Sequence, residues 1–91
     1  MIYVKRRWNE SRGDTYDNWG NSWWYFEVCA DGSVVRQIEE YDSGVIPKYS
    51  VDKTEDEYGA LAEKPLDLRH LKYCEISKDD FETLWSATSA W

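Results

Sequence analysis

The chain has 91 residues, of which 42% are hydrophobic and 32% are charged, with only two prolines and five glycines. This composition is typical of one folded domain and fits it better than a disordered chain. The formal net charge of -7 is uneven, because residues 1–12 carry four basic residues and one acid (+3) and the remainder carries seven and seventeen (-10). Such an acidic surface repels phosphate, so we expect a basic protein as partner, and neither direct nucleic-acid binding nor an anionic membrane.

Targeting and redox signals are weak in this sequence. No run of 18 apolar residues occurs, and the first residues lack the apolar stretch of a signal peptide, so we expect a cytoplasmic protein. Two cysteines, Cys29 and Cys74, are too few for a disulfide framework, and we expect both to be reduced and buried. We predict a single domain over residues 1–91 that is a monomer or a weak homodimer.

The first half of the chain predicts an antiparallel sheet. Ile2 to Trp8 is rich in strand-forming residues and predicts a first strand, and the polar residues 9–22 predict a loop. Further strands are expected over Trp23–Ala30 and Ser33–Tyr41, on either side of the hairpin signal Asp31-Gly32. Large apolar side chains occupy both faces of the segment from Trp23, which therefore predicts a central strand covered on both sides.

The register of this hairpin is open. A two-residue turn places Glu27 opposite Arg36, whereas a three-residue turn with Gly32 as a bulge places Val28 opposite Val34. The alternation of side chains does not decide between them, because both faces of the strand carry apolar groups.

The second half of the chain predicts an edge strand and a helix. Ile46 to Val51 is a possible strand, and Pro47 restricts it to the edge of the sheet. An acidic loop or short helix is expected around Glu55 to Ala62. Near the end, Ser77 is a suitable N-cap, and the apolar stripe of the following helix begins at Phe81. We predict an α+β fold, with an antiparallel sheet of about four strands and a C-terminal helix packed on one face.

Metal and catalytic motifs are not found. The window Asp52 to Glu63 has acids at positions suggestive of a calcium loop, but Glu57 stands where that loop requires glycine. His70 and Cys74 are spaced like a zinc pair, yet neither a second histidine nor a CxxC motif could complete a four-ligand site. No nucleophile motif is present either. We therefore predict no metal, no cofactor and no enzymatic activity.

The acidic residues of the middle of the chain are either a solubilising surface or a face for a cationic partner. In the second case the acids stand in for phosphates, and exposed aromatic residues anchor the contact. Trp19 and either Trp23 or Tyr41 are the candidate anchors, although each could instead pack in the core. The predicted partner-binding residues are Trp19, Trp23, Glu39, Glu40, Asp42, Glu55, Asp56 and Glu57.

Three segments carry a resemblance to a known family. The opening strand Tyr3 to Trp8, the aromatic strand before Asp31-Gly32 and the closing motif ISKxxFExLW, Ile76 to Trp85, resemble a family of small bacterial proteins of unknown function. Such proteins are similar in character to immunity proteins of polymorphic or contact-dependent toxin systems, which bind a toxin domain and block its active site. The resemblance implies neutralisation of a basic toxin, for example a nuclease. The alternative is an acidic mimic of nucleic acid that inhibits another basic protein, such as a defence nuclease.

Overall fold

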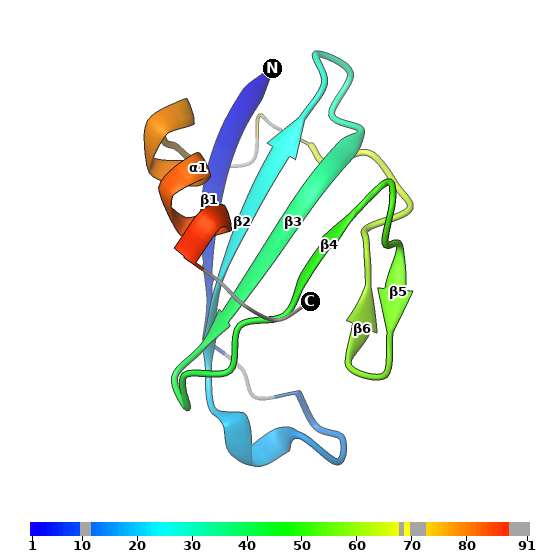
Figure 1. Cartoon of the computed structure of the whole chain (residues 1–91), viewed down its shortest axis with the longest axis vertical. Coiled ribbons are helices and arrows are strands. Elements are labelled where there is room, and N and C mark those ends of the chain that lie inside the picture. Colours follow the sequence, from blue (N-terminus) through cyan, green and yellow to red (C-terminus); the bar gives the residue numbers. More distant parts are fainter. Residues whose placement is uncertain (10–11, 68, 70–72, 88–91) are drawn as a thin grey trace.

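Figure 1 shows the chain in a computed structural model, which describes residues 1–9, 12–67, 69 and 73–87. Five antiparallel strands form the main sheet in the spatial order β4-β3-β2-β1-β7. Their bounds are β1 (Ile2–Trp8), β2 (Ser22–Val28), β3 (Val34–Tyr41), β4 (Lys48–Ser50) and β7 (Cys74–Glu75). The remaining elements are the short 3-10 helix η1 (Asp17–Trp19), a separate hairpin of β5 (Glu55–Asp56) and β6 (Gly59–Ala60), and helix α1 (Lys78–Ala87).

The predicted α+β fold is confirmed. β1 has the predicted bounds, and α1 packs on one face. β4 lies at the sheet edge as predicted, but it is shorter than the predicted Ile46 to Val51 and begins just after Pro47. The strand β7 was not predicted, and it adds a fifth strand by pairing Glu75 with Val4 and Cys74 with Lys5. A two-residue strand carries too little periodicity to be recognised, since its pairing depends on where the rest of the chain has placed β1.

A loop or a short helix was expected around Glu55 to Ala62, and the helix is wrong. These residues contain the β5–β6 hairpin, in which Glu55 pairs with Ala60 and Asp56 with Gly59. The Asp56 carboxylate accepts the backbone N–H of Tyr58 at 2.8 Å and that of Gly59 at 3.2 Å. An aspartate that binds the backbone two residues ahead favours a turn over a helix.

Both candidate registers of the central hairpin occur together. Glu27 lies opposite Arg36 and Val28 lies opposite Val34, because β3 has one extra residue, Val35, at this point. This β-bulge shifts the register between the two pairs. The alternation pattern alone could not reveal it, since each register fits one part of the hairpin.

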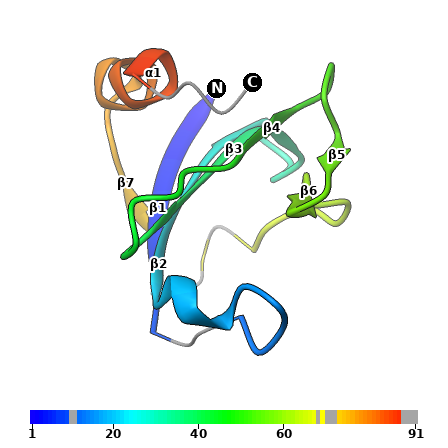
Figure 2. The ribbon, with the colours of Figure 1, turned by 60° about the horizontal axis from the view of Figure 1, so that its bottom comes forward.

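Two apolar layers cover the two faces of the sheet. On the face under α1, here called the helix face, Tyr3 and Ile38 pack against Phe81 of the helix, and the rings of Tyr3 and Phe81 are 5.4 Å apart. On the opposite face, here called the loop face, Phe26 and Val28 pack under the segment that follows β6. Figure 2 shows α1 on one side of the sheet and β6 on the other. The prediction of a central strand covered on both sides is thereby confirmed for β2.

An ion network fixes α1 on the sheet. Arg36 donates from Nε to Glu27 at 2.7 Å and also pairs with Glu82 of the helix, while the Tyr3 hydroxyl donates to Glu27 at 2.7 Å. The hydrogen bond from Arg36 lowers the pKa of Glu27, although burial acts in the opposite direction. Ser77 caps the helix as predicted, accepting the Asp80 N–H at 3.0 Å.

No helix formed by the described residues is long and apolar enough to cross a membrane.

Gly32 is required by the hairpin for two reasons. Its φ of +90° lies in the left-handed region, and a Cβ at this position would stand 2.4 Å from the Leu66 carbonyl oxygen. The Gly32 carbonyl also accepts the Leu66 N–H at 2.9 Å, which joins the hairpin to the segment on the loop face.

Replacing Gly32 by alanine is therefore expected to destabilise the protein by roughly 2 to 4 kcal/mol, from backbone strain and displacement of Leu66. Gly13→Ala is the matched control, because Gly13 also has a positive φ of +75° but nothing lies within 4 Å of its Cβ position. That control should lose only about 1 kcal/mol. Urea denaturation measures both values, and equal losses would contradict the role assigned to Leu66.

Candidate functional site

Arg12 lies against three aromatic rings, and a fourth ring packs beside two of them. Its guanidinium carbon is 5.2 Å from the ring centroid of Tyr16, 5.5 Å from that of Trp19 and 5.8 Å from that of Tyr41. The ring of Tyr58, at the turn of the β5–β6 hairpin, is 5.3 Å from Tyr16 and 5.4 Å from Trp19. Tyr16, Trp19, Tyr41 and Tyr58 are called the aromatic cluster below.

The hydrogen bonds of Arg12 connect the same segments. Nε donates to the Asp14 carboxylate at 3.1 Å, one terminal nitrogen donates to the Tyr41 hydroxyl at 3.2 Å, and the other donates to the Tyr58 carbonyl at 2.5 Å. Burial opposes the charge of Arg12, but its bonds to Asp14 and Tyr41 outweigh burial and raise the pKa of Arg12. The bond from Arg12 in turn lowers the pKa of Asp14. One guanidinium thus ties the loop after β1 to β3 and to the β5–β6 turn.

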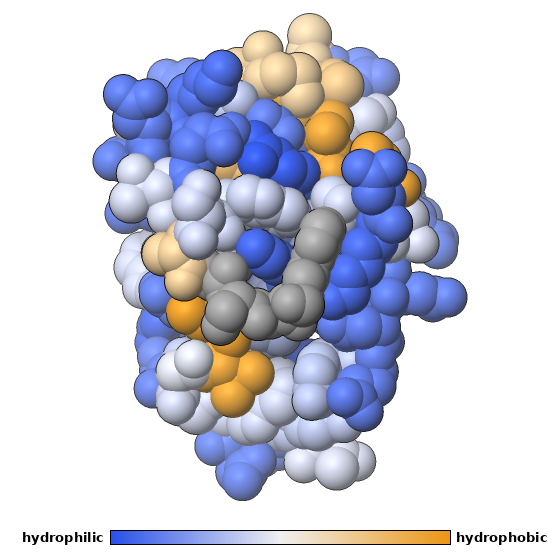
Figure 3. All heavy atoms as spheres, in the orientation of Figure 1, coloured by the Kyte–Doolittle hydropathy of each residue, from blue (hydrophilic) through white to orange (hydrophobic). Residues whose placement is uncertain are grey.

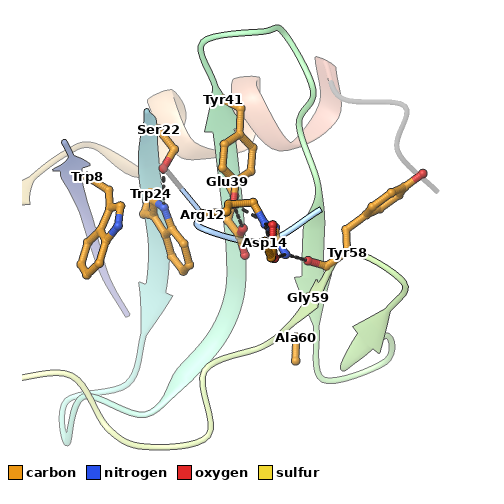
Figure 4. Close-up of a pocket in the computed structure, with 10 residues that line it drawn as sticks. All are labelled: Trp8, Arg12, Asp14, Ser22, Trp24, Glu39, Tyr41, Tyr58, Gly59 and Ala60. Atoms are coloured by element: carbon orange, nitrogen blue, oxygen red, sulfur yellow. Dashed lines mark hydrogen bonds and ion pairs between the residues drawn. The ribbon is translucent and has the colours of Figure 1, made fainter. Parts of the chain in front are cut away.

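A cavity of about 350 Å³ lies beside the aromatic cluster. Figure 4 shows Trp8 and Trp24 at one end of it, and Arg12 and Asp14 between these rings and Tyr58. Both charged side chains and aromatic rings line this cavity, and the charged ones are Arg12, Asp14 and Glu39.

Glu39 is buried next to this cavity, with only 2% of its surface exposed. Its carboxylate accepts the Tyr41 hydroxyl at 2.6 Å and the Gln37 side-chain amide at 2.9 Å. Burial raises the pKa of Glu39, although these two hydrogen bonds act in the opposite direction. Contrary to the prediction, Glu39 does not lie on an exposed acidic surface. Tyr41, the alternative aromatic anchor, is also buried.

The acids of the β5–β6 hairpin divide into structural and exposed groups. Asp56 is half-buried and accepts the Tyr49 hydroxyl at 2.9 Å, the Tyr58 N–H and the Gly59 N–H, so its carboxylate is used inside the fold. Glu55 and Glu57 are exposed on either side of it. Figure 3 shows hydrophilic residues along the edge of the molecule formed by this segment.

Trp23 lies on the other side of the sheet from the aromatic cluster. It is on the helix face, half-buried, with the Lys5 ammonium 4.9 Å and the Arg7 guanidinium 5.7 Å from its ring centroid. Glu40 pairs with Trp23 across the strands and accepts the Tyr25 hydroxyl at 3.3 Å. Trp23 therefore lies among both cations and acids, so its surroundings are of mixed charge.

Asp42 belongs with the group around Trp23. Its carboxylate pairs with Arg7 at 3.2 Å and accepts the Asn21 N–H at 3.1 Å, so it holds the beginning of β2 against the end of β3. The predicted partner-binding residues therefore do not form one surface. One group lies near Tyr58 and consists of Trp19, Glu55, Asp56 and Glu57. A second group lies on the helix face and consists of Trp23, Glu40 and Asp42. Glu39 is buried.

Sequence reasoning did not find four residues of this site, which are Arg12, Asp14, Tyr16 and Tyr58. The only local signal was a polar loop that contains two aromatic residues, Tyr16 and Trp19. The decisive contact joins residues 16 and 58, which are far apart in the chain, and no local pattern reports such a contact.

Within the described part of the chain, no group of three or more histidine, cysteine, aspartate or glutamate side chains could hold a metal. His70, half of the imagined zinc pair, lies outside the described residues. Cys29 is half-buried and Cys74 is exposed in β7, so neither cysteine is fully buried as expected.

Comparison with known proteins gave no match, whether to protein-family models, to curated proteins or to solved structures. The function is therefore proposed from the geometry of the site.

Removing the charge of Arg12 should loosen the loop it anchors. Arg12→Met keeps an apolar stem of similar length but loses all three hydrogen bonds, so we expect a loss of roughly 2 to 3 kcal/mol in unfolding free energy. Amide hydrogen exchange should accelerate in residues 13–20. Arg69→Met is the matched control, since the Arg69 side chain is 93% exposed and should change stability by less than about 0.5 kcal/mol. Unchanged exchange in Arg12→Met would contradict the anchoring role.

The buried carboxylate of Glu39 predicts a definite pH dependence. Its folded pKa is raised above the ordinary value of 4.5, so between these two values the folded state holds a proton that the unfolded chain has lost. The contribution of Glu39 to the unfolding free energy therefore falls as the pH rises through this range, and it stays lower above it. Glutamine has no such proton, so the unfolding free energy of Glu39→Gln should rise relative to wild type as the pH increases above 4.5. Denaturation curves at several pH values measure this difference, and parallel profiles would contradict it.

Proposed function

We propose that this protein is a non-catalytic binding protein of the cytoplasm that neutralises a basic toxin domain, in the manner of an immunity protein. The observation that carries the proposal is an aromatic cluster with exposed acids on both sides of it. Tyr16, Trp19 and Tyr58 are half-buried in this cluster. Exposed acids flank it from two segments, Asp14 and Asp17 from the loop and Glu55 and Glu57 from the hairpin.

This composition suits contact with a cationic protein. Tryptophan and tyrosine are the residues that most often contribute large binding energy when a partner covers them. Acids at the rim of such a contact add electrostatic complementarity, which accelerates association and excludes partners of like charge. The net charge of -7 attracts a basic partner over longer distances as well.

The surface is already ordered in the free protein, which favours binding. Arg12 holds Tyr16 and Trp19 against Tyr58 through ring contacts and through its bond to the Tyr58 carbonyl. The loop residues therefore lose little conformational freedom when a partner docks, and more of the contact energy is retained as affinity. The small size and acidic charge of the protein, which are also the character of immunity proteins, support a toxin domain as the partner.

Co-expression tests this function directly. The protein is produced in a bacterial host together with a basic toxin domain encoded beside its gene, and growth is measured. We expect the wild-type protein to restore growth and to bind the purified domain in a one-to-one complex. Continued growth arrest together with no binding by calorimetry would contradict the proposal.

Charge reversal locates the surface. Glu55→Lys and Glu57→Lys should each slow association with the toxin domain by about threefold to tenfold at low salt, because each places a cation beside the aromatic cluster. Glu75→Lys is the matched control, since Glu75 is also an exposed glutamate but lies in β7, at the other edge of the sheet from β4. Stopped-flow association rates measure the effect. Equal rate changes in all three variants would show a general charge effect and would overturn this assignment of the surface.

A further inference from the structure

The cavity beside the aromatic cluster has walls of two kinds. Trp8 and Trp24 form one end of it, and their ring centroids are 6.2 Å apart. Arg12 and Asp14 form a polar wall between these rings and Tyr58 (Figure 4). An apolar cavity of about 150 Å³ holds one benzene molecule, so the volume of about 350 Å³ has room for a ring molecule of roughly twice that size.

The polar wall has accessible surface and spare hydrogen-bonding capacity. The Arg12 side chain is 19% exposed and that of Asp14 is 47% exposed. The Asp14 carboxylate accepts the Tyr16 N–H at 2.9 Å and Arg12 Nε at 3.1 Å, and its exposed part can accept another donor. Arg12 has further N–H bonds beyond those that donate to Asp14, Tyr41 and Tyr58. An acceptor and a donor therefore lie side by side in the cavity wall.

The charges of this wall balance each other. The Arg12 guanidinium pairs with the Asp14 carboxylate at 3.0 Å, so a charged ligand that one of them attracts is repelled by the other. Glu39 also lines the cavity, but its carboxylate is buried and is already bonded to Tyr41 and Gln37. The wall therefore favours a neutral ligand that both donates and accepts hydrogen bonds.

We propose that this cavity binds one neutral sugar ring, a hexopyranose. Such a ring has an apolar C–H face, which packs on the indoles of Trp8 and Trp24. Its neighbouring hydroxyl groups donate to Asp14 and accept from Arg12. Trp8 is 37% exposed without a ligand, so the contact removes apolar surface from water. This site goes beyond the proposed function, because its ligand is a small molecule and its test needs no protein partner.

Titration of the ¹⁵N-labelled full-length protein with the methyl glycosides of glucose, galactose, mannose and N-acetylglucosamine tests the proposal. At least one of them should shift the indole N–H signals of Trp8 and Trp24 in a saturable way, with a dissociation constant on the order of 1 to 10 mM. The signal of Trp23, on the helix face, should not move. No saturable shift with any of the four at about 100 mM, or a shift centred on Trp23, would overturn the proposal.

Two further probes test the hydroxyl groups and the neutral charge of the ligand. Cyclohexanol keeps a six-membered apolar ring but has one hydroxyl group, and the uronate of the same sugar adds a negative charge. Each should bind at least about threefold more weakly than the best glycoside. Equal or tighter binding of cyclohexanol would show a merely apolar cavity, and equal or tighter binding of the uronate would show an anion site. Either result overturns the proposal, and neither depends on how a variant folds.

One pair of variants assigns the effect to Asp14. Asp14→Asn keeps an acceptor for the Tyr16 N–H but loses the charge and one acceptor oxygen, so it should weaken binding of the best glycoside about fivefold. Asp31→Asn is the matched control, because Asp31 is also exposed and accepts the N–H two residues ahead, that of Ser33 at 3.0 Å, but does not line the cavity. The control should bind as wild type does. Equal affinities of the two variants would contradict the hydrogen bond to Asp14 and the proposal with it.

Discussion

A single guanidinium holds the candidate binding surface together. Arg12 contacts three rings and donates three hydrogen bonds, and its partners come from the loop after β1, from β3 and from the β5–β6 turn. The loop contains only the single short helix η1 among its described residues, and no buried residue lies in that helix. Its order therefore depends on this cation and on the packing of Tyr16 and Trp19 against Tyr58. A charge enclosed in this way is unfavourable unless all its donors have partners, which makes the arrangement specific to one geometry.

The alternation of side chains along β2 determines which face of the sheet each of the four aromatic residues Trp23 to Phe26 occupies. Successive residues of a strand point to opposite faces, so Trp24 and Phe26 enter the loop-face layer, while Trp23 and Tyr25 point to the helix face. A slip of one residue would exchange these sets, and the bulge at Val35 confines the register change to the end of the hairpin. Of these four residues only Phe26 is fully buried, and Trp23, Trp24 and Tyr25 are half-buried like Tyr16 and Trp19 of the loop before them.

The sequence predicted the fold better than the site. The strands Ile2–Trp8, β2 and β3 and the cap of α1 depend on local chemistry, such as alternation, turn residues and a capping serine, and these signals were sufficient. The site depends on contacts between distant segments. Glu39 resembled a surface acid in the sequence but is buried by its position on the loop face of β3 beside Gln37 and Tyr41. Charge counts alone cannot separate such internal carboxylates from Glu55 and Glu57, which remain exposed.

The central claim is that a basic partner covers the aromatic cluster and the acids beside it. Amide hydrogen exchange of the protein, free and bound to the toxin domain, tests this claim most directly because it reports every segment in one measurement. The account predicts slower exchange on binding in residues 12–20 and 55–60, with residues 74–87, which contain β7 and α1, unchanged. Slower exchange in residues 74–87 without any change in residues 12–20 would contradict it.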